Sequence, residues 1–434
     1  MDIFQLLVNK LNDLSLEKIF PFVKPPLILS DINGRADELY LTDTTLRDGQ
    51  QAWKILSVEE SLKIYELLVE IANGSSVIRT TELFLYTPKD RQVVRGIIEF
   101  GARYPEPIGW IRASLDELRL VIEAGLQETT ILTSISDLHI KYKFGLDREK
   151  VIEKYLEVAE TAMKNGITPR CTLEDITRAD IDRNVVPFVE RLIRLSERYG
   201  VPFRLKLPDT LGVGLPFPGV PPPRGIPAII RRLTGIGVSP GNIIFHGHND
   251  FGLAVANSLA SWIYGANGVE TTIAGIGERA GNTPMEPMLL HLSGLRNGLN
   301  LTKIREIPRI LEEMGFSIPE FYPVIGRNAF KTKAGIHVDG FLKNPQVYLP
   351  FDPEAVLGIK PTVDITPYSG RAAVLLWLRK HVPHIADGID KDHPLVQQLY
   401  DEIVRIFNET KRSTPLSDEE MFQLLQNVIK VKQL

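Results

Sequence analysis

Cysteine is almost absent from this 434-residue sequence, which contains only Cys171. A single cysteine excludes an intramolecular disulfide, and such scarcity is typical of proteins in a reducing compartment. Cys171 lies in an apolar, strand-like stretch, where a free cysteine usually packs as a small hydrophobic side chain. We therefore expect an inert, buried residue, because a nucleophilic cysteine needs a nearby histidine and an electropositive setting.

Long apolar runs and blocks of basic residues are also missing. No apolar run approaches the roughly 20 residues that span a bilayer, and the amino-terminal segment lacks the basic region and unbroken apolar core of a secretory signal. Without a Lys/Arg-rich block, and with a formal net charge of -4, nucleic acid is not an expected partner. We expect a cytoplasmic protein that binds neither membrane nor nucleic acid.

Residues 38–300 alternate between short β-rich runs and amphipathic helical patterns, with no short repeat or low-complexity tract. Helical patterns occur, for example, at 58–71, 148–165, 181–199 and 253–266. Strand–helix alternation indicates parallel β/α architecture. The predicted strands are Tyr40–Thr44, Val77–Leu83, Pro107–Ala113, Thr129–Thr133, Thr168–Leu173, Phe203–Leu207, Ile243–His246 and Val269–Ile273.

Eight such units in about 250 residues are typical of a closed (β/α)8 TIM barrel. A doubly wound sheet is the competing architecture, but it usually carries a Gly-rich loop after its first strand, and here that strand runs into TLRDGQQ. We predict three parts: an N-terminal helical segment at 1–37, a catalytic barrel at 38–300, and a C-terminal, mainly helical extension at 301–434. Helical patterns in the extension cover Leu301–Met314, Gly370–Lys380, Pro394–Glu409 and Asp418–Lys430.

The carboxyl ends of barrel strands carry the functional residues in this fold. The first predicted strand leads to Arg47 and Asp48. A carboxylate beside a guanidinium at a barrel mouth can hold a metal while the arginine polarises a carbonyl. A surface ion pair in a loop is the alternative for these two residues taken alone.

The seventh predicted strand ends in His246 and His248. Residues two apart on a strand point in the same direction, so both imidazoles can reach one ion. Two histidines and one carboxylate form a common open site for a divalent metal. These residues therefore predict a metal site together with Asp48, although a single histidine is more often only a satisfied polar residue.

Other strand ends are also rich in polar residues. Glu174, Asp175 and Arg178 follow the fifth predicted strand, and Thr210 follows the sixth. The stretch from His139 to Lys143 is cationic enough to face a carboxylate. A Gly-rich turn at residues 274–282 offers backbone amides for a phosphate or a thioester oxygen, which is a weak signal by itself.

With these residues placed, the sequence resembles the DRE-TIM metallolyase superfamily, in particular its Claisen-condensing branch of isopropylmalate, homocitrate, citramalate and Re-citrate synthases. The resemblance covers nearly the whole chain. It rests on DTTLRDGQQ at 43–51, HGHNDFGLAVANS at 246–258, GERAGN at 277–282 and KAGIHVDG at 333–340.

The resemblance implies a role for each matching residue. Asp48, His246 and His248 would ligate the metal, with Asn282 at or near its coordination shell. Arg47 would polarise the 2-oxo group of the substrate. The remaining implied residues are Gln51 and Thr210 in the oxo-acid site, and Glu174, His337 and Tyr348 in acid/base catalysis.

The implied reaction is condensation of acetyl-CoA with a 2-oxo acid, assisted by Mn²⁺, Mg²⁺ or Co²⁺; the donor set alone also admits Zn²⁺. A base removes a proton from the acetyl methyl group, the enolate adds to the ketone, and thioester hydrolysis follows. In this branch the segment with His337 and Tyr348 reaches into a neighbouring barrel, which implies a homodimer with a swapped C-terminal segment. The N-terminal helical segment is a second candidate contributor to that interface, with simple packing against its own chain as the alternative.

The stretches LEDITRADID and LGVGLPFPGVPPPRGIP are most similar to Re-citrate synthases, whose substrate is oxaloacetate. Arg112, His139 and Arg178 are then candidates to bind its second carboxylate, with structural ion pairs as the alternative for each. Homocitrate synthases typically have Glu where this chain has Asp48, and isopropylmalate synthases usually carry an additional β-rich domain. These two activities, and citramalate synthesis, remain the alternatives.

Three other functions are compatible with a barrel of this kind. An acyl-CoA lyase would place a catalytic cysteine in the Gly-rich loop, and residues 275–282 contain none. A carboxyltransferase is disfavoured by the helical tail, and a barrel without catalysis by the presence of Arg47, His337 and the metal-ligand candidates. The proline-rich stretch at 215–227 is expected to form a stiff cover over the barrel mouth.

Overall fold

The computed structural model describes residues 35–431. These residues form two compact units, of which the first ends at Phe316 and the second begins at Ser317. The predicted N-terminal helical segment lies outside the described residues except for its last three positions. Among residues 35–431, no helix combines the length and apolar character needed to cross a membrane.

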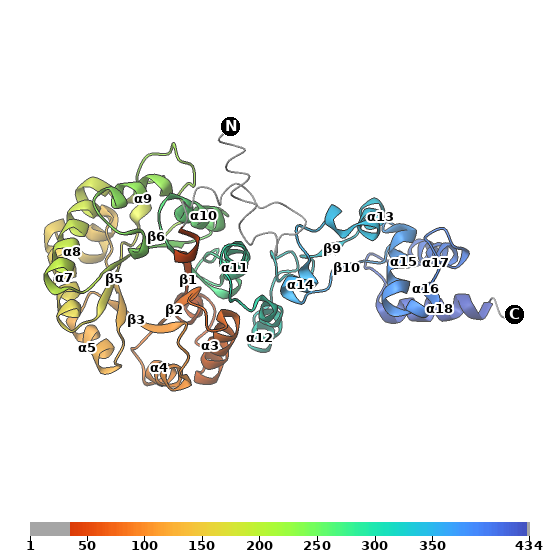
Figure 1. Ribbon diagram of the computed structural model, residues 1–434, viewed down its shortest axis with the longest axis horizontal. Helices are drawn as coiled ribbons and strands as arrows, with labels where there is room; N and C mark the ends of the chain where they lie inside the picture. Colours follow the sequence, from red (N-terminus) through yellow and green to blue (C-terminus); the bar gives the residue numbers. More distant parts are fainter. Residues whose placement is uncertain (1–34, 432–434) are drawn as a thin grey trace. The chain divides into compact units, whose positions relative to one another are not determined.

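The first unit contains a closed barrel of eight parallel strands in sequence order, surrounded by helices (Figure 1). This architecture confirms the predicted (β/α)8 fold, and all eight predicted strands are present with ends that differ by at most two residues. The strands are β1 (Tyr40–Asp43), β2 (Ile78–Leu83), β3 (Glu106–Arg112), β4 (Glu128–Leu132), β5 (Thr168–Thr172), β6 (Arg204–Asp209), β7 (Ile243–Gly247) and β8 (Gly268–Thr271).

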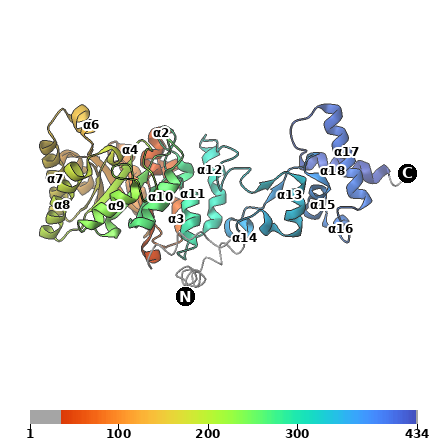
Figure 2. The same cartoon turned by 90° about the horizontal axis from the view of Figure 1, so that it is seen from above.

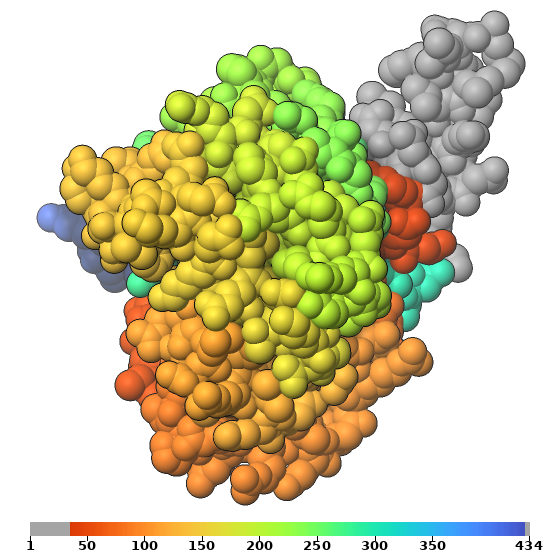
Figure 3. All heavy atoms as spheres, turned by 90° about the vertical axis from the view of Figure 1, so that its left-hand side faces the viewer, coloured from red at the N-terminus to blue at the C-terminus, as the bar shows by residue number. Residues whose placement is uncertain are grey.

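The helical layer lies outside the strands, and the side view in Figure 3 shows α5, α7 and α8 within a continuous outer surface. The main helices of this layer, several of which are labelled from a second direction in Figure 2, are α3 (Val58–Ala72), α4 (Pro88–Phe100), α5 (Leu115–Glu123), α7 (Arg148–Lys164), α8 (Val186–Tyr199), α9 (Ile226–Gly235), α10 (Ala254–Tyr264) and α11 (Met285–Ser293). The unit also includes η10 (Leu301–Glu306) and α12 (Ile307–Glu313), where the sequence predicted one continuous helix.

Local sequence signals explain where these helices begin and end. Ser57 and Glu60 form a capping box at the start of α3, in which each side chain accepts a hydrogen bond from the other residue's backbone N–H. Gly101 and Gly200 end α4 and α8 with φ angles of 72° and 66°, a left-handed conformation that glycine adopts without a steric penalty. These caps keep the connections between strands and helices short.

Cys171 is fully buried in β5, and burial raises the pKa of its thiol to about 12. The predicted burial of Cys171 is confirmed, and a thiol with such a raised pKa stays protonated at neutral pH.

The second unit packs helices around α15, with a short parallel ribbon of two strands beside them. Its hydrophobic core includes Val374, Leu378, Leu399 and Met421 from three helices. The predicted helices of this region are present, whereas the ribbon was not predicted. The elements are β9 (Lys331–Thr332), α13 (Gly335–Lys343), α14 (Pro353–Leu357), β10 (Thr362–Val363), α15 (Gly370–His381), α16 (Pro383–Ala386), α17 (Pro394–Thr410) and α18 (Asp418–Val431).

Candidate active site

The segment after β1 is held in one conformation by the carboxylate of Asp43. Its Oδ1 accepts hydrogen bonds from the backbone N and the hydroxyl of Thr45, and its Oδ2 accepts one from the Thr81 hydroxyl at 2.7 Å. The short helical segment η4 (Thr45–Gly49) follows directly and is entirely buried. Arg47 and Asp48 are therefore presented in a constrained, water-poor setting at the carboxyl end of β1.

The end of β7 brings His246 and His248 to the same place as Asp48. The two Nε2 atoms lie 3.1 Å apart, and the Asp48 Oδ2 atom lies 3.5 Å from His246 Nε2 and 4.0 Å from His248 Nε2. One donor atom from each of the three buried side chains falls within 4.8 Å of the others. Three donors that converge so closely from two strand ends have the arrangement of a metal site.

The chemistry of these donors fits a divalent cation. Burial and the neighbouring His246 lower the pKa of His248 to about 3, which keeps its imidazole neutral, as ligation requires. Burial opposes ionisation of Asp48, but the Arg47 cation holds the pKa of Asp48 below its usual range. Asn282 donates from Nδ2 to Asp48 Oδ2 at 2.6 Å, and its buried Oδ1 has no hydrogen-bond partner among the described residues.

Arg47 is fixed by three neighbours. Its Nε donates to Glu82 Oε1 at 2.6 Å, its Nη1 donates to Asp48 Oδ1 at 2.8 Å, and its guanidinium carbon lies 5.6 Å from the centre of the Trp110 ring. The side chain is 90 % buried. A guanidinium with its rotamer restrained in this way is preorganised to polarise an oxygen beside the metal-ligand candidates.

Behind these residues the barrel interior holds an ionic network that the sequence reasoning missed. Lys206 Nζ donates to Glu82 Oε2 at 2.6 Å and to Glu270 Oε2 at 2.9 Å, while Glu270 Oε2 also lies 2.6 Å from His246 Nδ1. Charged residues inside otherwise apolar strands were the available signal, because a buried charge needs a partner.

Glu174 follows β5 and is surrounded by donors. Both of its oxygens accept from Lys143 Nζ at 2.7 Å, Oε2 also accepts from the Ser134 hydroxyl, and His139 Nδ1 lies 3.2 Å from Oε2. Burial would raise the pKa of Glu174, but the contacts with His139, Lys143 and Ser134 lower it to about 2. The structure thus brings Glu174 together with two of the cationic residues between 139 and 143.

Three further predicted residues lie around Asp175. Arg178 donates to it from Nε and Nη2, both at 2.8 Å, and His139 Nε2 lies 3.6 Å from its Oδ2. The Thr210 hydroxyl accepts from the Asp175 backbone N at 2.9 Å. His139, Arg178 and Thr210 therefore share one cluster next to Glu174, in which Arg178 already has a carboxylate partner.

The other predicted substrate-binding residues are more exposed. Arg112, at the end of β3, pairs with Glu117 and keeps 71 % of its side chain exposed. It lines a pocket of about 470 Å³ that also contains Lys143 and Lys154. Gln51 is exposed in the short helix α2 (Gln50–Ala52).

The remaining predicted catalytic residues belong to the second unit. His337 on α13 and Tyr348 have ring centres 4.5 Å apart, and both side chains are exposed. An exposed imidazole beside a phenol offers a proton donor and acceptor pair.

Residues 38–311 match the model of the HMGL-like family, and residues 324–388 match that of the homocitrate synthase post-HMGL domain-like family. This chain belongs to the HMGL-like family. It is 40% identical over 403 residues to the citrate (Re)-synthase of Clostridium kluyveri, a match that covers 90% of this chain and 89% of that protein.

A second HMGL-like relative, the citrate (Re)-synthase of Syntrophus aciditrophicus, is 38% identical over 392 residues, which cover 89% of this chain and 62% of that protein. Among solved structures, the hydroxymethylglutaryl-CoA lyase of Pseudomonas aeruginosa aligns with a TM-score of 0.50 at 21% identity, over 64% of this chain and 94% of that protein. This structural likeness concerns the fold. The family predicted from the sequence is confirmed, and the names of the two relatives agree with the predicted condensing enzyme.

Proposed function

We propose that this protein condenses acetyl-CoA with oxaloacetate and releases citrate and CoA. The observation that carries this proposal is 40% identity over 90% of the chain to a citrate (Re)-synthase. The convergence of Asp48, His246 and His248 at the barrel mouth supports it, because a condensation of this kind needs an activated carbonyl.

Asp48, His246 and His248 would hold the divalent cation, which we propose to be Mn²⁺, Mg²⁺ or Co²⁺, with Asn282 beside it. A bound divalent ion supplies Lewis acidity to the carboxylate and oxo oxygens of the substrate. The guanidinium of Arg47 adds hydrogen-bond donors at the same oxo group, where negative charge develops as the new bond forms.

The condensation requires three changes of bonding, and hydrolysis of the thioester is the fourth. A base takes a proton from the acetyl methyl group, the methyl carbon bonds to the carbonyl carbon of oxaloacetate, and the oxo oxygen takes up a proton to become a hydroxyl. Water then cleaves the thioester and releases CoA as a free thiol together with a new carboxylate.

We assign the acid/base steps to Glu174, His337 and Tyr348. With a pKa near 2, Glu174 is a weak base while Lys143 is bound to it. We therefore propose His337 as the proton acceptor, with Tyr348 assisting it and Glu174 orienting the proton transfer. Gln51, Thr210 and the cations Arg112, His139 and Arg178 would contact the substrate.

We also propose a homodimer in which the segment with His337 and Tyr348 serves the barrel of the other subunit. The exposure of both rings supports this, because a catalytic imidazole needs an apolar, water-poor surround that an exposed position lacks. A cytoplasmic location is proposed from the single, buried cysteine.

The test is release of free thiol from acetyl-CoA in the presence of oxaloacetate, with the protein first stripped by a chelator and then resupplied with Mn²⁺. We expect activity to disappear on stripping, to return with the ion, and to be absent from Asp48→Ala and His248→Ala. Thiol release that is equal in stripped and resupplied protein would contradict the metal-dependent mechanism.

Homocitrate formation from 2-oxoglutarate is the second candidate, because residues 324–388 match the homocitrate synthase post-HMGL domain-like family. The same assay with 2-oxoglutarate distinguishes the two. A faster reaction with 2-oxoglutarate than with oxaloacetate would select the second candidate.

A further inference from the structure

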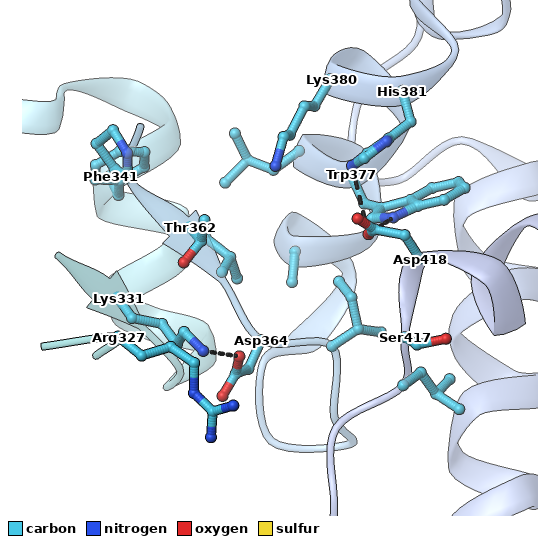
Figure 4. A pocket seen from close by; sticks show the side chains of 16 residues that line it. Arg327, Lys331, Phe341, Thr362, Asp364, Trp377, Lys380, His381, Ser417 and Asp418 are labelled. Atoms are coloured by element: carbon cyan, nitrogen blue, oxygen red, sulfur yellow. Dashed lines mark hydrogen bonds and ion pairs between the residues drawn. The ribbon is translucent and has the colours of Figure 1, made fainter. Parts of the chain in front are cut away.

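The second unit contains a pocket of about 430 Å³, and all of its lining residues belong to that unit (Figure 4). Its walls come from the β9–β10 ribbon on one side, from α15 on another, and from the first residue of α18. This volume lies in the range of pockets that take small organic ligands.

One stripe of α15 forms much of the lining. Ala373 lies three residues before Leu376 and four before Trp377, and Lys380 follows these two at four and three residues, so the four share one face of the helix. Ala373 and Trp377 are buried, whereas Lys380 is exposed at the end of the stripe. The face is therefore an apolar wall with one cation at its edge.

Lys380 is the unpaired charge of this pocket. No hydrogen bond or ion pair joins its ammonium group to any residue between 35 and 431, and Figure 4 shows the side chain directed into the cavity. An unpaired lysine aimed into a pocket beside an apolar wall can recognise an anion, since partial burial of an anionic ligand there would strengthen the ion pair.

The opposite wall adds further positive charge. The carboxylate of Asp364 lies 3.0 Å from Lys331 Nζ and 3.0 Å from Lys333 Nζ, so one anion is shared by two cations. Arg327 also lines the pocket and pairs with Glu320. Cations therefore outnumber carboxylates on this side of the pocket.

The aromatic part of the α15 wall is held rigidly. Trp377 stacks on His381 with ring centres 4.9 Å apart and an interplanar angle of 21°. Its Nε1 donates to Asp418 Oδ1 at 2.8 Å, and the His381 Nε2 atom lies 3.4 Å from the same oxygen. Because its Nε1 is bound to Asp418 and one face stacks on His381, the indole is fixed as a flat surface against which an apolar group can pack.

We propose that this pocket binds a small organic carboxylate whose apolar body packs against Leu376 and Trp377 and whose charge is neutralised by Lys380. The proposal concerns the second unit alone and does not rest on the reaction assigned to the barrel. A ligand of this class matches the three features of the cavity, which are an apolar wall, a fixed indole and an unpaired cation.

Titration with 4-methylpentanoate, followed by tryptophan fluorescence of the full-length protein, tests the proposal. The other tryptophans, Trp53, Trp110 and Trp262, all belong to the first unit, so loss of the signal in Trp377→Phe assigns it to the pocket. We expect a saturable change with the carboxylate and binding about tenfold weaker with 4-methylpentanamide, which has the same body without the charge.

Lys380→Gln should weaken binding of 4-methylpentanoate by about tenfold. Arg379→Gln is the matched control, because Arg379 is an exposed cation on the same helix that does not line the pocket, and it should bind as the unaltered protein does. The proposal would be overturned if Lys380→Gln bound 4-methylpentanoate as tightly as the unaltered protein does. It would also be overturned if the amide bound as tightly as the carboxylate, or if the titration gave no saturable change. A signal that appears only after dimers dissociate would assign the pocket to a second copy of the chain and would overturn it as well.

Discussion

Glu270 connects the barrel interior with the candidate metal ligands, because its carboxylate contacts both Lys206 and the Nδ1 atom of His246. The carboxylate holds Nδ1, which leaves Nε2 facing His248 and Asp48, and would orient the imidazole for the proposed metal ion. We predict that Glu270→Gln weakens Mn²⁺ binding by about 10- to 100-fold, measured by calorimetric titration of chelator-stripped protein.

Glu128→Gln is the matched control for this measurement. Glu128 is also ion-paired within the barrel unit, with Arg170 and Arg204, but it is the first residue of β4 and therefore lies at the opposite end of the barrel. Equal Mn²⁺ affinity in the two variants would show that Glu270 does not orient His246.

Glu286 gives the fold a defined pH dependence. It is fully buried on α11, its Oε1 accepts from the Ala274 backbone N at 2.8 Å, and its Oε2 has no hydrogen-bond partner among the described residues. Burial raises its pKa from 4.5 to about 7. The folded state therefore binds the proton more tightly than the unfolded state, and the stability that this group contributes below pH 4.5 is lost as the pH rises through 7.

Glu286→Gln should remove that loss, because the amide cannot ionise. Relative to the unaltered protein, the variant is predicted to gain at most about 3 kcal/mol in free energy of unfolding between pH 5 and pH 8. Urea denaturation at both pH values measures the difference, with Glu123→Gln, an exposed position on α5, as control. A gain that is the same at both pH values would contradict the assignment.

At the scale of single elements, the proline-rich loop between β6 and α9 can be shortened to test its proposed role. Leu215 N donates to Arg224 O at 2.8 Å, and Ile226 N donates to Leu215 O at 3.0 Å. These two hydrogen bonds join the two ends of the proline-rich stretch. Replacing residues 217–223 by two glycines should keep these two hydrogen bonds and remove the proposed cover of the barrel mouth. We predict that kcat falls about tenfold while Mn²⁺ affinity and the thermal midpoint stay unchanged.

A variant with a loop of unchanged length separates the effect of covering the barrel mouth from the effect of the loop's stiffness. Changing Pro221, Pro222 and Pro223 to alanine keeps the chain long enough to cover the mouth but removes the restricted φ angles. Turnover that is unaffected by the deletion would show that the loop does not shield the reaction.

Strand and helix order were predictable because each β/α unit carries its own signals. Alternation of apolar runs with amphipathic helices specified all eight strands, and left-handed glycines such as Gly101 and Gly200 marked helix ends. The ribbon of β9 and β10 was missed because each strand has two residues, too few for an alternating pattern.

The site was only partly predictable for a physical reason. The rule that strand ends carry function located Asp48, His246 and His248, and the structure brings them together. The rule does not apply to residues inside the strands, so it did not identify Glu82, Lys206 and Glu270. Sequence spacing also does not show which charges pair, and the contact between Lys143 and Glu174 needed three-dimensional coordinates.

At the scale of the whole molecule, the proposed exchange between subunits makes a prediction about mixtures. Arg47→Ala disables a barrel and His337→Ala disables a second unit, so each variant alone should be inactive. If His337 serves the partner's barrel, a hybrid dimer has one complete site, and an equal mixture should recover about one quarter of the unaltered activity. Hybrid dimers that form and stay inactive would show that each chain completes its own site.

The most direct measurement of the central claim is kcat/KM for thiol release with five 2-oxo acids: oxaloacetate, 2-oxoglutarate, 2-oxoisovalerate, pyruvate and glyoxylate. The account predicts that kcat/KM for oxaloacetate exceeds that of each of the others by about 100-fold or more. Glyoxylate, pyruvate and 2-oxoisovalerate lack a second carboxylate and would leave its proposed partners unpaired, and the longer 2-oxoglutarate would misplace its second carboxylate. It also predicts citrate as the product. Preference for any other oxo acid, or no thiol release from all five, would contradict the account.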